Sequence, residues 1–171
     1  TKVVSLDQHL EAQTLKRFNT GYSELNRVLG GGLVAGSFNL LGGSPGVGKS
    51  TLLMQMAGGL AKNNQKVLYI SGEESTEQTG SRAQRLGVRT SKVLVASESN
   101  LNSIIDICRN QKPDVVIIDS IQSIFLPELQ AAPGTVSQVR ECAGHLMSLA
   151  KSDGMALVLI GHVTKEGSIA G

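Results

Sequence analysis

One eight-residue segment restricts the fold of this chain more than any other feature. It matches the phosphate-loop pattern G-x-x-x-x-G-K-[ST] in full and reads Gly43-Ser44-Pro45-Gly46-Val47-Gly48-Lys49-Ser50. The pattern predicts a glycine-rich turn between a strand and a helix, where backbone N–H groups and the positive end of the helix dipole surround an anion. We therefore expect a strand over residues 37–41 and a helix over residues 50–61.

The rest of the chain continues this alternation of strands and helices. Short apolar runs predict strands over residues 67–70, 93–96, 115–118 and 155–160. Apolar residues at helical spacing predict helices over residues 22–29, 76–86, 101–112 and 136–150. Ser75 with Gln78, and Asn100, supply capping signals for two of them. Such alternation is typical of an α/β fold with a mostly parallel sheet covered by helices on both faces.

The composition suits one folded domain and excludes several function classes. Charged residues are 18% and hydrophobic residues 40% of the 171 residues, which gives a core and excludes a disordered chain. A net charge of +2 excludes nucleic-acid binding through bulk charge, and two tyrosines and three phenylalanines are too few for a base-stacking platform. Cys108 and Cys142 fall on apolar helix stripes and are expected to be buried free thiols. Without a long apolar run, we expect a cytoplasmic protein with no membrane partner.

Phosphate-loop chemistry assigns roles to four residues. Lys49 is expected to reach the β- and γ-phosphates of ATP or ADP, Ser50 to hold Mg²⁺, and Thr51 to bond the α-phosphate. Asp119 ends the apolar run over residues 115–118, at the strand end where ligands bind in such sheets, so we expect it to orient the same Mg²⁺. The alternative is a glycine-rich turn and a buried strand that carry these residues by chance.

Two acids and one histidine are candidates for the hydrolysis step. Glu73 and Glu74 follow the predicted strand over residues 67–70, where a carboxylate can orient and polarise an attacking water. Glu73 is nearer the strand and is our catalytic candidate, although both acids would also favour the dipole of the next helix. His162 follows the last predicted strand, where it either contacts the γ-phosphate or only caps the strand end.

Several segments together resemble one known family. They are residues 20–21 (TG), 24–33 (ELNRVLGGGL), 69–75 (YISGEES), 118–123 (IDSIQS), 132–141 (APGTVSQVRE) and 161–171 (GHVTKEGSIAG). Over about residues 15–171 the chain closely resembles the ATPase core of the RadA (Sms) family of bacterial DNA-repair proteins, within the RecA-like superfamily. The resemblance implies a RecA-like P-loop NTPase core.

The resemblance also implies an activity and partners. Members are DNA-stimulated ATPases that drive branch migration in homologous recombination, form homo-oligomeric rings such as hexamers, and act on single-stranded DNA and recombination intermediates, with RecA as a further partner. Glu73 falls where the superfamily keeps its water-activating glutamate, and His162 where relatives keep a γ-phosphate sensor. The two DNA-binding loops fall at residues 122–136 and 164–171, with Arg140 and Lys165 as the nearest basic contacts.

Departures from the family pattern leave other functions open. Full-length members carry a four-cysteine zinc motif before this core, and a Lys-Asn-Arg-Phe-Gly motif and a Lon-protease-like domain after it. We therefore expect residues 1–18 to be an arm or linker and residues 19–171 to be an ATPase core truncated at its C-terminus. The first rival is a RecA-like regulatory switch indifferent to DNA. The others are a small-molecule P-loop kinase, for which no arginine-bearing lid is obvious, and a purely structural module.

Overall fold

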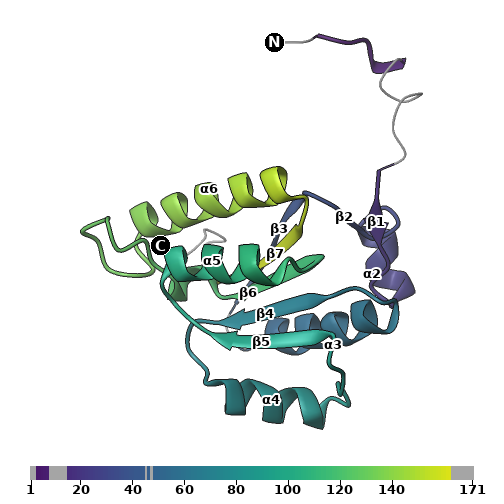
Figure 1. Cartoon of the computed structure of the whole chain (residues 1–171), viewed down its shortest axis with the longest axis horizontal. Helices are drawn as coiled ribbons and strands as arrows, with labels where there is room; N and C mark the ends of the chain where they lie inside the picture. The colour runs from purple at the N-terminus through teal and green to yellow at the C-terminus, as the bar shows by residue number, and fades with distance from the viewer. Residues whose placement is uncertain (1–2, 8–14, 45, 47, 163–171) are drawn as a thin grey trace.

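A five-stranded parallel sheet forms the centre of the molecule, with strand order β3-β7-β6-β4-β5 (Figure 1). The computed structural model describes residues 3–7, 15–44, 46 and 48–162. The strands are β3 (Phe38–Gly43), β4 (Val67–Ser71), β5 (Val93–Ser97), β6 (Val115–Asp119) and β7 (Ala156–His162). All five predicted strands are confirmed, and each extends one or two residues beyond its predicted carboxyl end.

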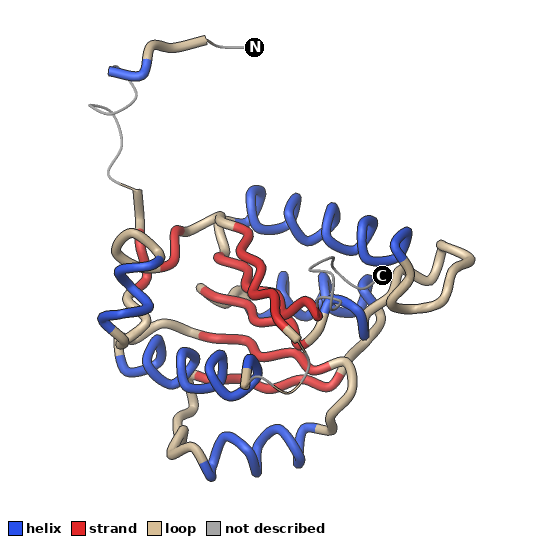
Figure 2. The backbone as a smooth tube through the Cα atoms, turned by 180° about the vertical axis from the view of Figure 1, so that it is seen from behind, coloured by secondary structure: helices blue, strands red, loops and turns tan. Residues whose placement is uncertain are grey.

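Helices cover both faces of the sheet, as predicted (Figure 2). They are α3 (Lys49–Lys62) and α4 (Thr76–Arg85) on one face, and α5 (Leu101–Gln111) and α6 (Val136–Asp153) on the other. The connections through α3 and α4 cross the sheet toward β5, and those through α5 and α6 return toward β3. With right-handed crossovers, a helix whose connection moves one way along the sheet lies on one face, and a helix whose connection moves the other way lies on the opposite face. Ser75 forms a capping box with Gln78, and Asn100 caps α5, so both capping predictions are confirmed.

Two apolar cores lie on either side of the sheet. On one face Leu68, Ile118 and Leu159 pack with α5 and α6, where the free thiols of Cys108 and Cys142 are buried as predicted. On the other face the alternate strand residues, such as Ile117, pack under α3. Because the inner strands are buried on both faces, their sequences read as continuous apolar runs. This rigid sheet fixes where the polar residues at its carboxyl end stand.

A small antiparallel pair lies beside the main sheet, and the sequence did not predict it. It pairs β1 (Arg17–Phe18) with β2 (Leu33–Val34), and the short helix α2 (Ser23–Val28) lies between them in sequence. Phe18 and Leu33 belong to the core under α3. Gly32 has φ +129° and a Cβ there would collide with the carbonyl oxygen of Phe18. The last two residues of the expected arm thus belong to the folded body.

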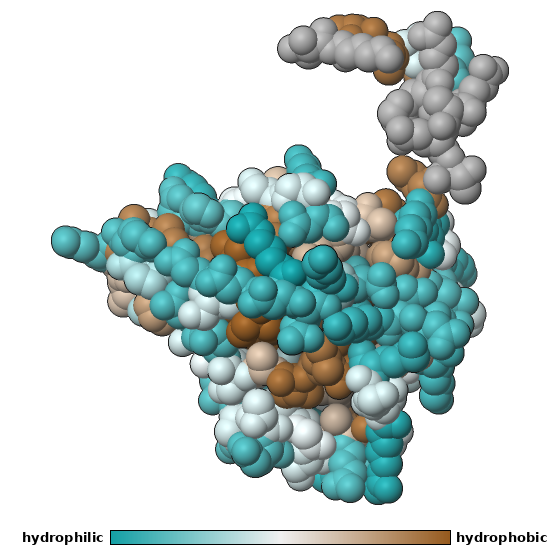
Figure 3. All heavy atoms as spheres, in the orientation of Figure 1, coloured by the Kyte–Doolittle hydropathy of each residue, from teal (hydrophilic) through white to brown (hydrophobic). Residues whose placement is uncertain are grey.

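The face seen in Figure 3 is mostly polar, with apolar side chains in several places. Figure 3 shows apolar side chains gathered between α4 and α5, where the edge strand β5 lies, and residues 93–96 of this strand are only half-buried. Within the described residues, no helix has both the length and the apolar character that crossing a membrane requires.

Candidate functional site

The phosphate loop joins the carboxyl end of β3 to the start of α3, as the motif predicts. Gly46 and Gly48 have φ values of +84° and +82°, a conformation that glycine adopts without strain. Gly48 is the N-cap of α3 and has no side chain with which to cap it, so the first N–H groups of the helix are left for an anion. Pro45 and Val47 lie outside the described residues.

Lys49 is a buried cation at this loop. Only 7% of the residue is exposed, and Nζ donates to the carbonyl oxygens of Gly43 at 2.8 Å and Ser44 at 2.6 Å. These are neutral dipoles that leave the positive charge of the ammonium uncompensated, and burying such a charge is costly. The arrangement therefore favours the arrival of an anion at the loop, and the contact of Lys49 with phosphates stays a prediction.

Ser50 and Asp119 meet at the centre of the site. The Ser50 hydroxyl donates to Asp119 Oδ2 at 2.7 Å, which joins the first turn of α3 to the end of β6. A hydroxyl beside a carboxylate fits Mg²⁺, which binds oxygen and uses one or two protein carboxylates together with substrate phosphates. Three or more metal-binding side chains do not cluster anywhere in the described part of the chain. These two residues would hold the ion, and the α-phosphate candidate Thr51 follows Ser50 in α3.

Asp119 also belongs to a buried polar network that sequence reasoning missed. Tyr69 in β4 donates from its hydroxyl to Asp119 Oδ2 at 2.7 Å, and Arg82 in α4 donates to the Tyr69 oxygen at 3.4 Å. Burial, followed by the charge of Asp119, raises the pKa of Tyr69, so the phenol stays protonated and can donate. A tyrosine in a strand buried on both faces was the available signal, because its hydroxyl needs a partner there.

The two candidate glutamates stand in different surroundings. Glu74 is half-buried and accepts from Arg82 Nη2 at 2.7 Å, whereas Glu73 is exposed. No ion pair or side-chain hydrogen bond of Glu73 is found within residues 3–7, 15–44, 46 and 48–162. The backbone N–H groups of both donate to Ser71 Oγ, so the turn itself is fixed. The carboxylate of Glu73 thus makes no contact of this kind within the described residues, and its role toward a water stays a prediction.

His162 ends β7 and lies in register with Gly43, the first residue of the phosphate loop. Gln122 ties its backbone in both directions: the amide nitrogen donates to the His162 carbonyl at 3.2 Å, and its oxygen accepts from the His162 N–H at 3.3 Å. Nδ1 is buried without a hydrogen-bond partner in the part of the chain that the structure describes. A buried donor or acceptor near a phosphate loop is suited to sense a ligand. Sequence reasoning did not single out Gln122.

Of the segments expected to meet DNA, only the first is described. Gln138 is fully buried, and its side-chain amide holds the loop before α6 through the backbone of Leu126, Leu129 and Ala131. Arg140 is exposed on α6. Lys165 and the segment over residues 164–171 lie outside the described residues.

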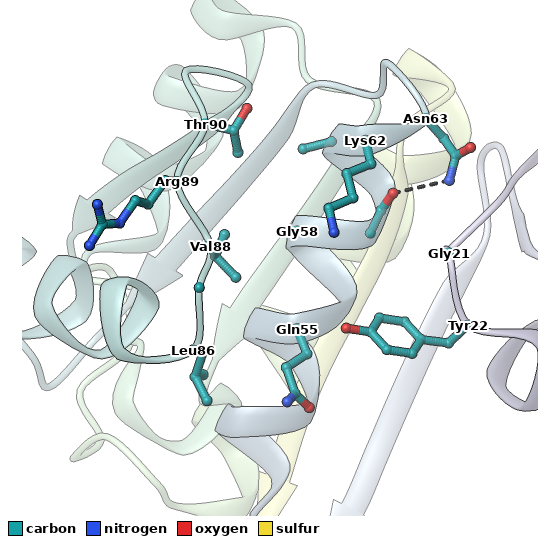
Figure 4. A pocket seen from close by; sticks show the side chains of 13 residues that line it. Gly21, Tyr22, Gln55, Gly58, Lys62, Asn63, Leu86, Val88, Arg89 and Thr90 are labelled. Atoms are coloured by element: carbon teal, nitrogen blue, oxygen red, sulfur yellow. Dashed lines mark hydrogen bonds between the residues drawn. The ribbon is translucent and has the colours of Figure 1, made fainter.

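One hollow lies away from this site. It has a volume of about 500 Å³ and lies between α3, the loop after α4 and the start of α2 (Figure 4). Its wall includes Tyr22, Gln55, Lys62 and Arg89, and none of the phosphate-loop residues. This hollow is therefore separate from the candidate nucleotide site.

The comparisons place the chain among known proteins. The model of a family described as AAA domain matches residues 7–168. Proteins named DNA repair protein RadA are similar: that of Listeria monocytogenes is 52% identical over 95% of this chain and 35% of its own length. The Haemophilus influenzae protein is 46% identical over 99% and 37%, and the Escherichia coli protein 48% identical over 95% and 35%. The chain thus spans about a third of the length of these relatives, and the resemblance noted from sequence is confirmed.

Solved structures agree on the fold. "The Structure Of A DnaB-Like Replicative Helicase And Its Interactions With Primase" matches 94% of this chain and 48% of that one, with a TM-score of 0.73 and 16% identity. A second solved structure, described as an ATPase domain, matches 96% of this chain and 73% of that one, with a TM-score of 0.74 and 15% identity. At this identity the likeness concerns the fold alone, and it confirms the predicted RecA-like α/β core.

Proposed function

This chain belongs to the AAA domain family, and from that premise we propose that it is the ATP-binding and ATP-hydrolysing core of a DNA repair protein. One observation carries the proposal: a phosphate loop whose Lys49 is buried beside an uncapped helix start, with Ser50 hydrogen-bonded to Asp119 across the site. A helix N-terminus, a lysine and a hydroxyl–carboxylate pair are the parts that bind the phosphates of a nucleoside triphosphate with its Mg²⁺.

The residues divide the hydrolysis step between them. The N–H groups at the start of α3 and the ammonium of Lys49 hold the phosphates and stabilise the charge of the transition state. Ser50 and Asp119 would hold Mg²⁺, which when bound neutralises charge on the β- and γ-phosphates. Glu73 accepts a hydrogen bond from the attacking water and orients it in line with the leaving group. His162, whose Nδ1 is unpartnered among the described residues, contacts the γ-phosphate and relays its presence to the segment that follows β7.

The proposed partner is single-stranded DNA, bound by a ring of copies of the full-length protein. Similarity to proteins named for DNA repair, and to a structure titled as a replicative helicase, supports this assignment. In such a ring, the nucleotide would be held between subunits. Residues 122–136 and 164–171 with Arg140 and Lys165 would contact the strand, branch migration of recombination intermediates would be the work done, and RecA a partner.

The test measures ATP hydrolysis by the full-length protein and by this chain, each with and without single-stranded DNA. Stimulation of the full-length protein is the expected result, because the proposed function couples ATP hydrolysis to DNA binding. Turnover that ignores DNA would replace the motor with the regulatory switch. Transfer of phosphate to a small acceptor instead of water would replace it with a kinase.

A further inference from the structure

We propose that Tyr69 and Arg82 are positioning residues of the hydrolysis site, which hold Asp119 and Glu74 in one connected network. The inference rests on the proposed function, because it assigns the two residues a task in Mg²⁺ binding and ATP hydrolysis at the same site. Neither residue belongs to the phosphate loop or to the candidate metal and water contacts.

Asp119 Oδ2 receives two hydrogen bonds at the same distance. Ser50 donates from the first turn of α3 and Tyr69 from the middle of β4, each at 2.7 Å. Two donors from different elements fix both the position and the rotation of the carboxyl group, so that Oδ1 has one direction. The outer contacts of a metal-binding carboxylate orient it and tune its affinity in this way.

Arg82 bridges this carboxylate to Glu74. Its Nη2 lies 2.7 Å from Glu74 Oε1, 3.4 Å from the Tyr69 oxygen and 4.0 Å from Asp119 Oδ2. The side chains of Arg82 and Asp119 are only 15% and 13% exposed, so screening by water is weak. The guanidinium also lies 5.6 Å from the centre of the Tyr69 ring. The guanidinium of Arg82 thus holds the carboxylates of Asp119 and Glu74 at a fixed separation.

The same network fixes the turn that carries Glu73. The backbone N–H of Gly72 donates to the Asp119 carbonyl at 3.1 Å, and Ser71, whose side chain accepts from the turn, is in register with Asp119. Gly72 is close to Ser123, where a Cβ would collide with the hydroxyl. With Glu74 held by Arg82, the residue before it has its backbone fixed on both sides. Glu73 can then present its carboxylate at a constant place relative to Asp119.

The second terminal nitrogen of Arg82, Nη1, is a buried hydrogen-bond donor. It has no hydrogen-bond partner among the residues that the structure describes. A buried unsatisfied donor costs free energy in a folded protein and is retained where a site uses it. The state of Nη1 therefore favours a role for Arg82 at the hydrolysis site in addition to its ion pair with Glu74.

The first test removes single groups and measures binding as well as turnover. Tyr69→Phe deletes one hydroxyl and keeps the buried ring, and Arg82→Met deletes the charge with little change in volume. Arg85→Met is the matched control, because Arg85 is exposed on the same helix. The readouts are the affinity for a fluorescent ADP analogue in EDTA, the Mg²⁺ concentration that half-saturates the Mg²⁺-dependent binding, and kcat with KM for ATP.

Both variants are expected to keep the EDTA affinity and to need about 10-fold more Mg²⁺, the usual effect of losing an outer contact of a metal ligand. kcat falls while KM for Mg²⁺-ATP at saturating Mg²⁺ changes little, Arg82→Lys restores part of kcat, and Arg85→Met matches the parent. An unchanged Mg²⁺ requirement and kcat in both Tyr69→Phe and Arg82→Met would overturn the inference, as would an equal loss in Arg85→Met.

Lys49→Ala separates this inference from the proposed function. If Lys49→Ala hydrolyses ATP at the parent rate, the proposed function fails and the inference fails with it. If Lys49→Ala loses ATP hydrolysis while Tyr69→Phe and Arg82→Met behave as the parent, only the positioning role fails. Should Arg82→Met not fold, Tyr69→Phe alone decides the inference.

Discussion

At the scale of single residues, two adjacent glutamates differ in what surrounds them. Glu74 is held by Arg82 in a partly buried ion pair, and Glu73 is exposed beside it. A carboxylate with one oxygen already bound by a guanidinium is a poorer acceptor for a reacting water, because the cation occupies a lone pair and lowers the basicity of the group. In the proposed division of labour, Glu74 anchors the turn and Glu73 meets the water.

Glu73→Gln should leave ATP binding nearly unchanged and lower the hydrolysis rate by about 100-fold or more, since the amide cannot accept the proton. Glu74→Gln is the matched variant and should lower the rate less, through a looser turn. Single-turnover phosphate release with parallel binding titrations checks both. If Glu74→Gln loses hydrolysis while Glu73→Gln keeps it, the two roles are reversed.

At this scale, a functional residue could be predicted from the sequence when its chemistry is carried by a short local segment, and not when it depends on contacts between distant elements. Lys49, Ser50 and Asp119 were found because a short motif and a strand end carry their chemistry. Tyr69 and Arg82 were missed because their hydrogen bonds form only when β4, α4 and β6 pack together. A tyrosine in an apolar run looks like core until its hydroxyl is seen to have a partner.

At the scale of elements, α3 packs closely against the segment before α2 because residue 59 is a glycine. A Cβ at Gly59 would collide with the carbonyl oxygen of Thr20, so the segment before α2 touches the helix backbone directly. The strands and helices of the main sheet were predictable from apolar periodicity. The pair β1 and β2 was not, since each strand has two residues and shows no alternation. Only the burial of Phe18 and Leu33 reveals why it forms.

Gly59→Ala should therefore destabilise the fold by about 1–3 kcal/mol, the usual cost of overpacking a core contact. Gly80→Ala is the control, because Gly80 is exposed in α4 with open space around it, and alanine there should stabilise the fold by up to about 1 kcal/mol. Urea unfolding of both variants checks the pair. Equal stability of Gly59→Ala and the parent would show that the backbones at Gly59 and Thr20 are not in close contact.

At the scale of the whole molecule, the functional groups gather at one edge of the sheet. Asp119 and His162 are the last residues of β6 and β7, Glu73 follows the carboxyl end of β4, and the phosphate loop continues from the end of β3. The order β3-β7-β6-β4 brings them together although they are far apart in sequence. This gathering could be expected from a parallel α/β fold.

DNA binding belongs to this scale, and Arg140 and Lys165 are its candidates. Arg140→Ala and Lys165→Ala in the full-length protein should weaken binding of single-stranded DNA, each lowering the slope of log K against log salt by about 0.7. Lys112→Ala is the control, since Lys112 is exposed just before β6, at the opposite edge of the sheet from Asp119. A salt slope equal to that of the parent would remove the residue concerned from the interface.

The measurement that tests the central claim most directly is a titration of this chain and its Lys49→Ala variant with Mg²⁺-ATP. The parent should bind one nucleotide, and the variant should bind at least about 10-fold more weakly, because it loses charge-assisted hydrogen bonds to the phosphates. Equal affinity of the two proteins, with both folded, would show that ATP does not bind at the phosphate loop and would contradict the account.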